Sequence, residues 1–295
     1  MEHYEHSPTA KTGNAGVPSR GRLPPGTQWE RLTFAAQEQG EGKLLATVKA
    51  PLPCHIYVSA DESAESSSAA ADENSVRLML VPGGDPEGQE WVQAAWDWLE
   101  PGVPVELRQG HLITLQGSRV LWTAGRACII APANRLESLR LTVAEFCLHE
   151  GEVRKMETAV AQDWPQLEAD TPLAFIYEDK DSHRREELAK RFQKAIQLRT
   201  QVARLQPVLH RPPVHPPTLA SQLCERLKER TRLLERVEFL GEQVDVFERV
   251  YEMCGQRSND HSLSRKSTML EWIIIILLAT ETIILLVDLM NSTGN

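Results

Sequence analysis

The feature that most constrains this chain is an apolar run near its C-terminus, residues 270–289, in which thirteen positions are Leu, Ile or Val. A helix of this length spans about 30 Å, which matches the hydrocarbon core of a bilayer. On insertion scales the thirteen side chains contribute about −6 kcal/mol, against about +3 kcal/mol for the carboxylate of Glu281. The run therefore predicts a transmembrane helix, and the alternative is a buried helix of a soluble core.

The residues around the run predict its orientation. Arg257, Arg265 and Lys266 lie in a juxtamembrane segment, residues 257–269, whereas the tail of residues 290–295 carries no basic residue. Because Lys and Arg are retained on the cytoplasmic side, we expect the preceding part of the chain in the cytoplasm or an equivalent compartment. So short a tail predicts insertion after synthesis ends, as for a tail anchor.

Polar residues inside the run predict a contact within the membrane. Glu271, Glu281 and Asp288 fall on one face of a helical wheel, and Trp272 lies where one interface is expected. Glu281 would lie deep in lipid, so it loses its charge or faces a partner helix or a polar defect. Either the acid is tolerated singly, or these four residues serve anchoring and oligomerisation.

The N-terminal part predicts a mixed α/β head domain over residues 29–181. Short apolar runs bounded by turn residues indicate strands at residues 44–48, 55–58, 76–81, 112–115 and 120–122. Residues 91–99 place Trp91, Ala95, Trp98 and Leu99 on one helical face. Residues 1–28 lack periodic apolar positions and predict a disordered leader, and residues 60–75 predict an acidic surface loop.

Longer helices are expected after Pro132. One helix runs from about Leu136 towards Trp164, where Pro165 ends it, and residues 173–177 form a strand or begin the next helix. Residues 182–256 predict a helical hairpin or coiled coil that is interrupted by an extended Pro-rich connector, residues 207–217. Thr218 is the expected N-cap of one uninterrupted helix that reaches Cys254.

An apolar seam follows the second half of this last helix. Its residues step by four and three, as in a heptad repeat: Leu233, Val237, Leu240, Val244, Phe247 and Tyr251. The seam packs either on the preceding helix of the same chain or on a second copy. The expected fold class is α+β: an N-terminal mixed α/β head, a long C-terminal helical hairpin or coiled-coil stalk, and one C-terminal transmembrane helix.

Several kinds of chemistry lack a signature. A net charge of −9 argues against direct DNA binding through bulk electrostatics, and five scattered cysteines without a CxxC pair suggest neither a disulfide framework nor a zinc site. The glycine-rich VPGGDPEG lacks the spacing of a phosphate-binding loop, and His149 and Glu150 are assigned to the polar side of a helix. We therefore expect no catalytic residue, cofactor or metal.

The C-terminal half resembles a known family. The segments LESLRLTVAEFCLHEGEV, RREELAKRFQKAIQLRTQVARL, LLERVEFLGEQVDVFERVYEM and STMLEWIIIILLATETIILL together are similar to the family called "required for meiotic nuclear division", a domain of unknown function. The resemblance covers about residues 135–286. Its most specific part is the Leu-Glu-Trp-Ile start of the apolar run, with Glu271, Trp272 and the later Glu281 in the family's places.

The resemblance implies a non-catalytic scaffold or assembly factor anchored in a membrane. Eukaryotic relatives are associated with the mitochondrial inner membrane, face the matrix and support translation; without a transit peptide, a bacterial inner membrane is favoured here. The expected partners are the lipid bilayer, a second copy through the stalk and membrane helix, unknown proteins and, as a further class, the ribosome. The alternative is a membrane-tethered enzyme or a nucleotide-binding head.

Overall fold

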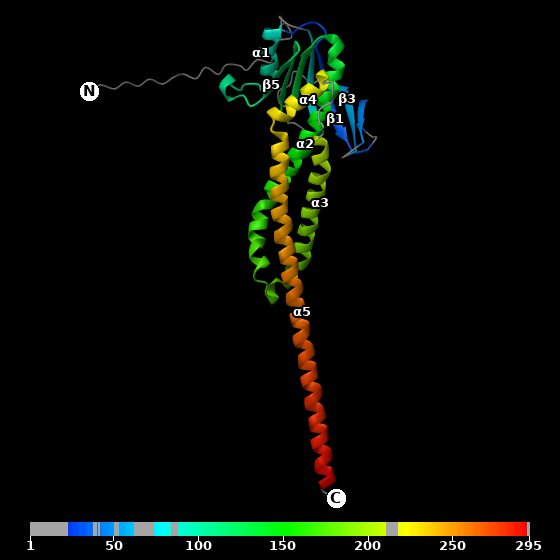
Figure 1. The fold of residues 1–295 in the computed structure, drawn as a ribbon, viewed down its shortest axis with the longest axis vertical. Helices are drawn as coiled ribbons and strands as arrows, with labels where there is room; N and C mark the ends of the chain where they lie inside the picture. The colour runs from blue at the N-terminus through cyan, green and yellow to red at the C-terminus, as the bar shows by residue number, and fades with distance from the viewer. Residues whose placement is uncertain are drawn as a thin grey trace, which may run out of the picture. The chain divides into compact units, whose positions relative to one another are not determined.

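The chain is α+β with a helical C-terminus (Figure 1). The computed structural model describes residues 23–37, 40, 42–49, 53–61, 74–83, 88–210 and 218–293. Most of the predicted leader, most of the acidic loop, residues 211–217 of the connector and the last two residues of the tail lie outside these ranges, as does the side chain of Asp288.

A seven-stranded sheet forms the N-terminal part. Its strands are β1 (Gln28–Ala35), β2 (Lys43–Val48), β3 (Cys54–Ala60), β4 (Ser75–Pro82), β5 (His111–Leu115), β6 (Ser118–Thr123) and β7 (Arg126–Ala131), in the order β2-β3-β1-β4-β7-β6-β5. β4 and β7 pair in parallel, and the other neighbours are antiparallel. The five predicted strands are present, and β1 and β7 were missed. A crossover through helix α1 (Gly88–Leu99) precedes β5.

Both faces of the central strands are buried. Met79, Val81, Leu121 and Cys128 form one cluster with Ala95, Trp98 and Leu99 of α1, which confirms the predicted apolar face of this helix. On the opposite face, the ring of Trp122 meets Phe146 edge to face at 5.4 Å. Two-sided burial explains why β4 and β7 read as nearly continuous apolar runs.

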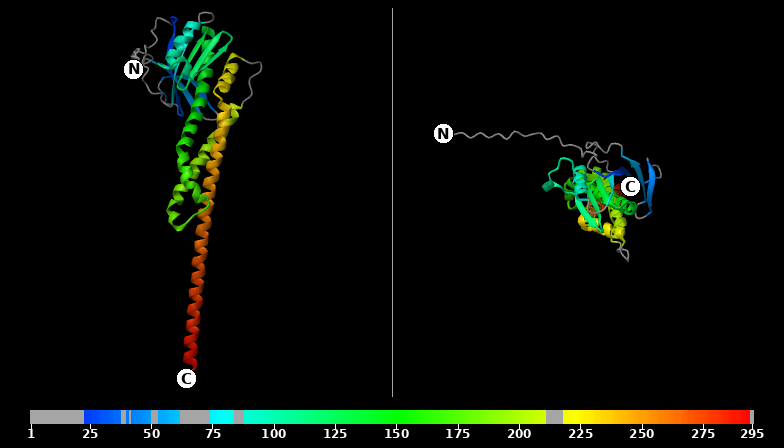
Figure 2. Two further views of the ribbon diagram at one scale, coloured as in Figure 1. Left: turned by 90° about the vertical axis from the view of Figure 1, so that its left-hand side faces the viewer. Right: turned by 90° about the horizontal axis from the view of Figure 1, so that it is seen from above.

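Two compact units share the long helices. Unit 1 comprises Met1–Lys155 and Arg204–Val237, and unit 2 comprises Met156–Ala203 and Glu238–Asn295. The long helices are α2 (Ala133–Asp170), α3 (Arg185–Leu209) and α5 (Leu233–Thr293), and α4 (Leu219–Arg230) belongs to unit 1. Within unit 2, α2 and α3 lie beside α5 (Figure 2).

The prediction that Pro165 ends a helix is wrong, because α2 continues through it to Asp170. A proline inside a helix costs about 3 kcal/mol through a lost hydrogen bond and a steric clash. Packing in unit 2 offsets this cost: the ring of Trp164 meets Phe247 at 5.4 Å, and Leu167 is buried. Residues 171–174 form a 3-10 turn, so the apolar run at 173–177 is neither a strand nor the start of a helix.

The connector also begins later than predicted. Pro207 lies inside the last turn of α3, between buried Leu205 and Leu209. The Lys228 ammonium donates a hydrogen bond of 3.1 Å to the Leu209 carbonyl, one of the acceptors that a helix C-terminus leaves open. Burial and this bond stabilise a turn that the proline alone disfavours.

The helix predicted from Thr218 to Cys254 is two helices. Thr218 is the N-cap, as predicted, and its hydroxyl accepts a hydrogen bond from the Ser221 amide. The chain turns at Thr231 and Arg232, where Arg232 has a left-handed φ of 51°. The Thr231 hydroxyl donates to the Leu227 carbonyl at 2.8 Å and so helps to close α4 before α5 begins.

Candidate functional site

The C-terminal half of α5 exposes a long apolar surface. In the described part of the chain, one helix is long and apolar enough to cross a membrane, and none of its apolar window is buried. Between 43% and 66% of each large side chain is exposed: Met269, Leu270, Trp272, Ile273, Ile274, Ile275, Ile276, Leu277, Leu278, Ile283 and Ile284. A core helix of a soluble protein would be covered, so the apolar surface requires another environment.

Polar groups inside this surface differ in how they are satisfied. The hydroxyls of Thr280 and Thr282 donate to the carbonyls of Ile276 and Leu278, each at 2.7 Å, so the helix itself satisfies them. Glu281 is exposed, and no hydrogen bond or ion pair to it is found among the described residues. Of the two carboxylates in the described span, Glu281 therefore lies deeper along the helix than Glu271 and is not satisfied by the helix as the threonines are.

The other predicted anchor residues lie on the same helix. Glu271 and Trp272 are exposed at the start of the apolar surface, and Arg257, Arg265 and Lys266 are exposed on the preceding turns of α5. Their position is consistent with the predicted juxtamembrane segment. Their roles in anchoring and topology stay predictions.

The seam residues are buried within the single chain. Leu233 and Val237 are buried in unit 1, and Leu240, Val244, Phe247 and Tyr251 are buried in unit 2, where α2 and α3 lie beside α5. A side chain that its own chain covers is not free to enter a second copy, so the structure favours the intramolecular alternative. A coiled coil between copies stays a prediction.

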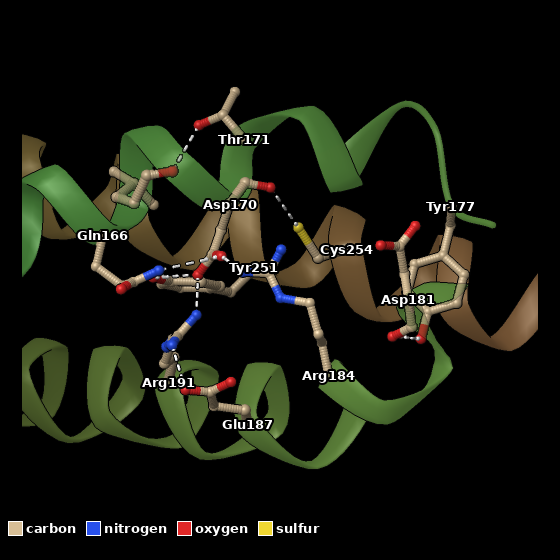
Figure 3. A network of polar contacts seen from close by, with 11 residues as sticks. Gln166, Asp170, Thr171, Tyr177, Asp181, Arg184, Glu187, Arg191, Tyr251 and Cys254 are labelled. Atoms are coloured by element: carbon tan, nitrogen blue, oxygen red, sulfur yellow. Dashed lines mark hydrogen bonds and ion pairs between the residues drawn. The ribbon is translucent and has the colours of Figure 1, made fainter. Parts of the chain in front are cut away.

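A buried polar network not anticipated from the sequence lies in unit 2 (Figure 3). Asp170, at the end of α2, is fully buried, and its two carboxylate oxygens form ion pairs with Arg184 and Arg191. The Tyr251 hydroxyl donates to the same carboxylate at 3.4 Å, and the Cys254 thiol donates to the Asp170 carbonyl at 3.7 Å. One residue thus connects α2, the start of α3 and α5.

The protonation states suit this structural role. Burial, and then the charge of Asp170, raise the pKa of the Tyr251 hydroxyl above its ordinary value, and the same causes raise the pKa of the Cys254 thiol to about 11. Both groups therefore remain protonated donors at neutral pH. Glu187 accepts from Arg191 at 2.5 Å, so two carboxylates balance two guanidinium groups.

A second buried carboxylate corrects the assignment of His149 and Glu150 to the polar side of a helix. Glu150 is only 3% exposed and pairs with Arg154 and, at 3.3 Å, with Arg236 of α5. Burial is the main cause that lowers the pKa of His149 to about 4. Both residues face the interior of unit 1.

Unit 1 also carries an open groove of about 710 Å³ beside β1, β2 and β3. Glu30 and Arg140 in its wall form an ion pair of 2.8 Å, and burial raises the pKa of Glu30 despite this partner. Among the described residues, no group of three or more His, Cys, Asp or Glu side chains is arranged to hold a metal.

Together these features define an α+β protein whose helical C-terminus carries one candidate membrane span. No family model and no curated protein matches the chain. Similar solved structures include the CorA magnesium transporter from Methanocaldococcus jannaschii, with 12% identity over 75% of this chain and 78% of that chain and a TM-score of 0.34. Full-length CmaX protein is 14% identical over 83% of this chain and 81% of that chain, with a TM-score of 0.30. TM-scores this low support no inference about fold or function.

Proposed function

We propose that this chain is a single-pass membrane scaffold or assembly factor, held in the bilayer by residues 270–289, with its preceding domains in the cytoplasm or a matrix-like compartment. The observation that carries the proposal is the continuous apolar surface of α5, none of which the chain covers. Lipid is the environment that makes such a surface favourable, and a helix of about 30 Å matches its thickness.

The rest of the span agrees with this proposal. Both threonines satisfy their hydroxyls within the helix, as insertion into hydrocarbon requires. Arg257, Arg265 and Lys266 precede the span and favour retention of that side in the cytoplasm. Glu281 then serves association with a partner helix, since a carboxylate in lipid gains most from a polar neighbour.

Membership in the "required for meiotic nuclear division" family remains part of the proposal, and it suggests the process. An anchored, non-catalytic protein would hold a protein complex, or a ribosome, at the membrane. A ribosome tether predicts co-sedimentation that weakens as salt rises, because RNA contacts release counterions.

The test compares the full-length chain with a chain that ends at Ser267 in membrane extraction. We expect the full-length protein to resist carbonate and to need detergent, and the shorter chain to be soluble. Crosslinking of both forms, followed by identification of the proteins recovered, then names the partners. Release of the full-length protein by salt or carbonate alone would refute the anchor.

The groove beside β1 to β3 favours one alternative, a membrane-tethered enzyme or nucleotide-binding head. Its wall holds a carboxyl group of raised pKa beside a guanidinium group, as ligand sites often do. This alternative predicts that nucleotides or other anionic ligands raise the melting temperature, and that Arg140→Gln removes the effect. The scaffold is preferred because Arg140 is already paired with Glu30 and Glu137.

A further inference from the structure

The turn between α2 and α3 exposes two adjacent large apolar side chains. Phe175 and Ile176 are each 66% exposed, and they belong to a stretch of seven uncharged residues, 171–177. Across the turn, Leu173 and Ala174 are buried in unit 2. The two exposed side chains therefore point away from the buried side of the turn, which Leu173 and Ala174 form.

The turn is held in this conformation by specific bonds. The amides of Phe175 and Ile176 both donate to the Pro172 carbonyl, at 3.1 and 3.0 Å. The Tyr177 hydroxyl donates to the Asp181 carbonyl at 3.0 Å, and its ring lies 5.6 Å from that of His261 on α5. Because hydrogen bonds fix both ends of the turn, Phe175 and Ile176 lie on an ordered segment of backbone.

The contact with His261 gives the level of the turn along α5. His261 precedes Leu270 by nine residues, so the turn lies about 14 Å along the helix from the start of the span. The headgroup region occupies about 5–8 Å of this distance on each side of the hydrocarbon. Part of the distance that remains between the turn and the headgroup region is spanned by the side chains themselves. A helix tilt of about 20°, as membrane helices show, shortens it further.

We infer that Phe175 and Ile176 form a second, peripheral contact with the same bilayer, inserting between lipid headgroups beside the span. The inference rests on the proposed anchor. Lipid is the occupant because the exposed pair lies on the unit that continues into the span, and because Leu263, Arg265 and Lys266 are exposed on α5 between the two. Basic residues at this level attract anionic headgroups, and apolar ones enter the headgroup boundary.

The experiment places an environment-sensitive fluorophore at single positions of the full-length protein in vesicles of phosphatidylcholine and phosphatidylglycerol. The label is attached to Ile176→Cys in a Cys224→Ser background, since the other four native cysteines are buried. Lipids that carry a nitroxide quencher in the headgroup or in the acyl chain report the depth. Leu277→Cys labels the span, and Val246→Cys is the matched control on α5, about 36 Å before Leu270.

We expect both quenchers to act at position 277, the headgroup quencher to act at 176, and neither to act at 246. Adding Phe175→Asp should reduce quenching at 176, whereas Phe239→Asp, at a similarly exposed apolar position of α5, should leave it unchanged. Quenching at 277 without quenching at 176 overturns the peripheral contact and leaves the anchor standing. Absence of quenching at 277 overturns the anchor, and equal quenching at 176 and 246 overturns a contact confined to the turn.

Discussion

Asp170→Asn tests whether the buried carboxylate holds unit 2 together. The substitution keeps the size of the side chain but removes the charge that Arg184 and Arg191 share. Removing one partner of a buried ion pair costs about 3–5 kcal/mol, because the other partner stays desolvated. The two arginine side chains are 27% and 20% exposed, so we expect a loss near the lower end, about 3 kcal/mol.

The measurement is urea unfolding of the full-length protein in detergent, followed by tryptophan fluorescence. Asp163→Asn is the matched control, since it lies on the same helix and pairs with Lys194 at 2.6 Å, but the two side chains are 31% and 53% exposed. An exposed pair contributes less than about 1 kcal/mol. If both variants lose the same free energy of unfolding, the Asp170 network does not stabilise the fold as argued.

Three further predictions follow from other contacts. Glu281→Leu should keep the protein in the membrane but weaken its crosslinking to itself or a partner by about 5- to 30-fold, the equivalent of about 1–2 kcal/mol for a polar contact between membrane helices. The control Thr280→Val should leave crosslinking unchanged. Unchanged crosslinking of Glu281→Leu contradicts a role for Glu281. His149 has a folded pKa of about 4, below its unfolded pKa of about 6.5. Its contribution to the free energy of unfolding is therefore complete above about pH 6.5 and falls as the pH drops towards 4. His149→Gln should therefore recover up to about 2 kcal/mol of the stability that wild type loses between pH 8 and 5, and an identical loss in both proteins rejects the assignment. Thr218→Ala should lower the free energy of unfolding by about 1 kcal/mol because it removes the N-cap of α4, as measured by urea unfolding. Thr268→Ala is the control, and an equal loss in both variants would show that the N-cap does not contribute the predicted stability.

The sequence predicts those elements whose signal is local. The apolar run of α5, the face of α1 and the cap at Thr218 each depend on residues within a few positions of one another. β1 was missed because Glu30 and Arg31 stand together in its centre and hide the strand pattern. Both charges have partners that are distant along the chain: Glu30 pairs with Arg140, and Arg31, which is partly exposed, lies 3.8 Å from Asp61.

Errors at the prolines have the same cause. Pro165 and Pro207 each oppose helix continuation locally, yet packing and hydrogen bonds from other helices keep both turns helical. The Asp170 network was missed because Arg184, Arg191 and Tyr251 lie 14, 21 and 81 residues away along the chain. No spacing rule links such residues before three helices bring them together.

The Asp170 network also fixes which side of α5 can meet a partner in the membrane. Tyr251 and Cys254 both contact Asp170, so they set the rotation of α5 about its axis within unit 2. Glu281 follows Cys254 by 27 residues on the same helix, which is about seven and a half turns. Glu281 therefore lies on the side of the helix axis opposite to Cys254. Leu263, exposed and 18 residues before Glu281, lies on the same side as Glu281, about five turns earlier. A partner helix that satisfies Glu281 would therefore approach the side of α5 that faces away from Asp170, and crosslinks from Leu263→Cys should capture it.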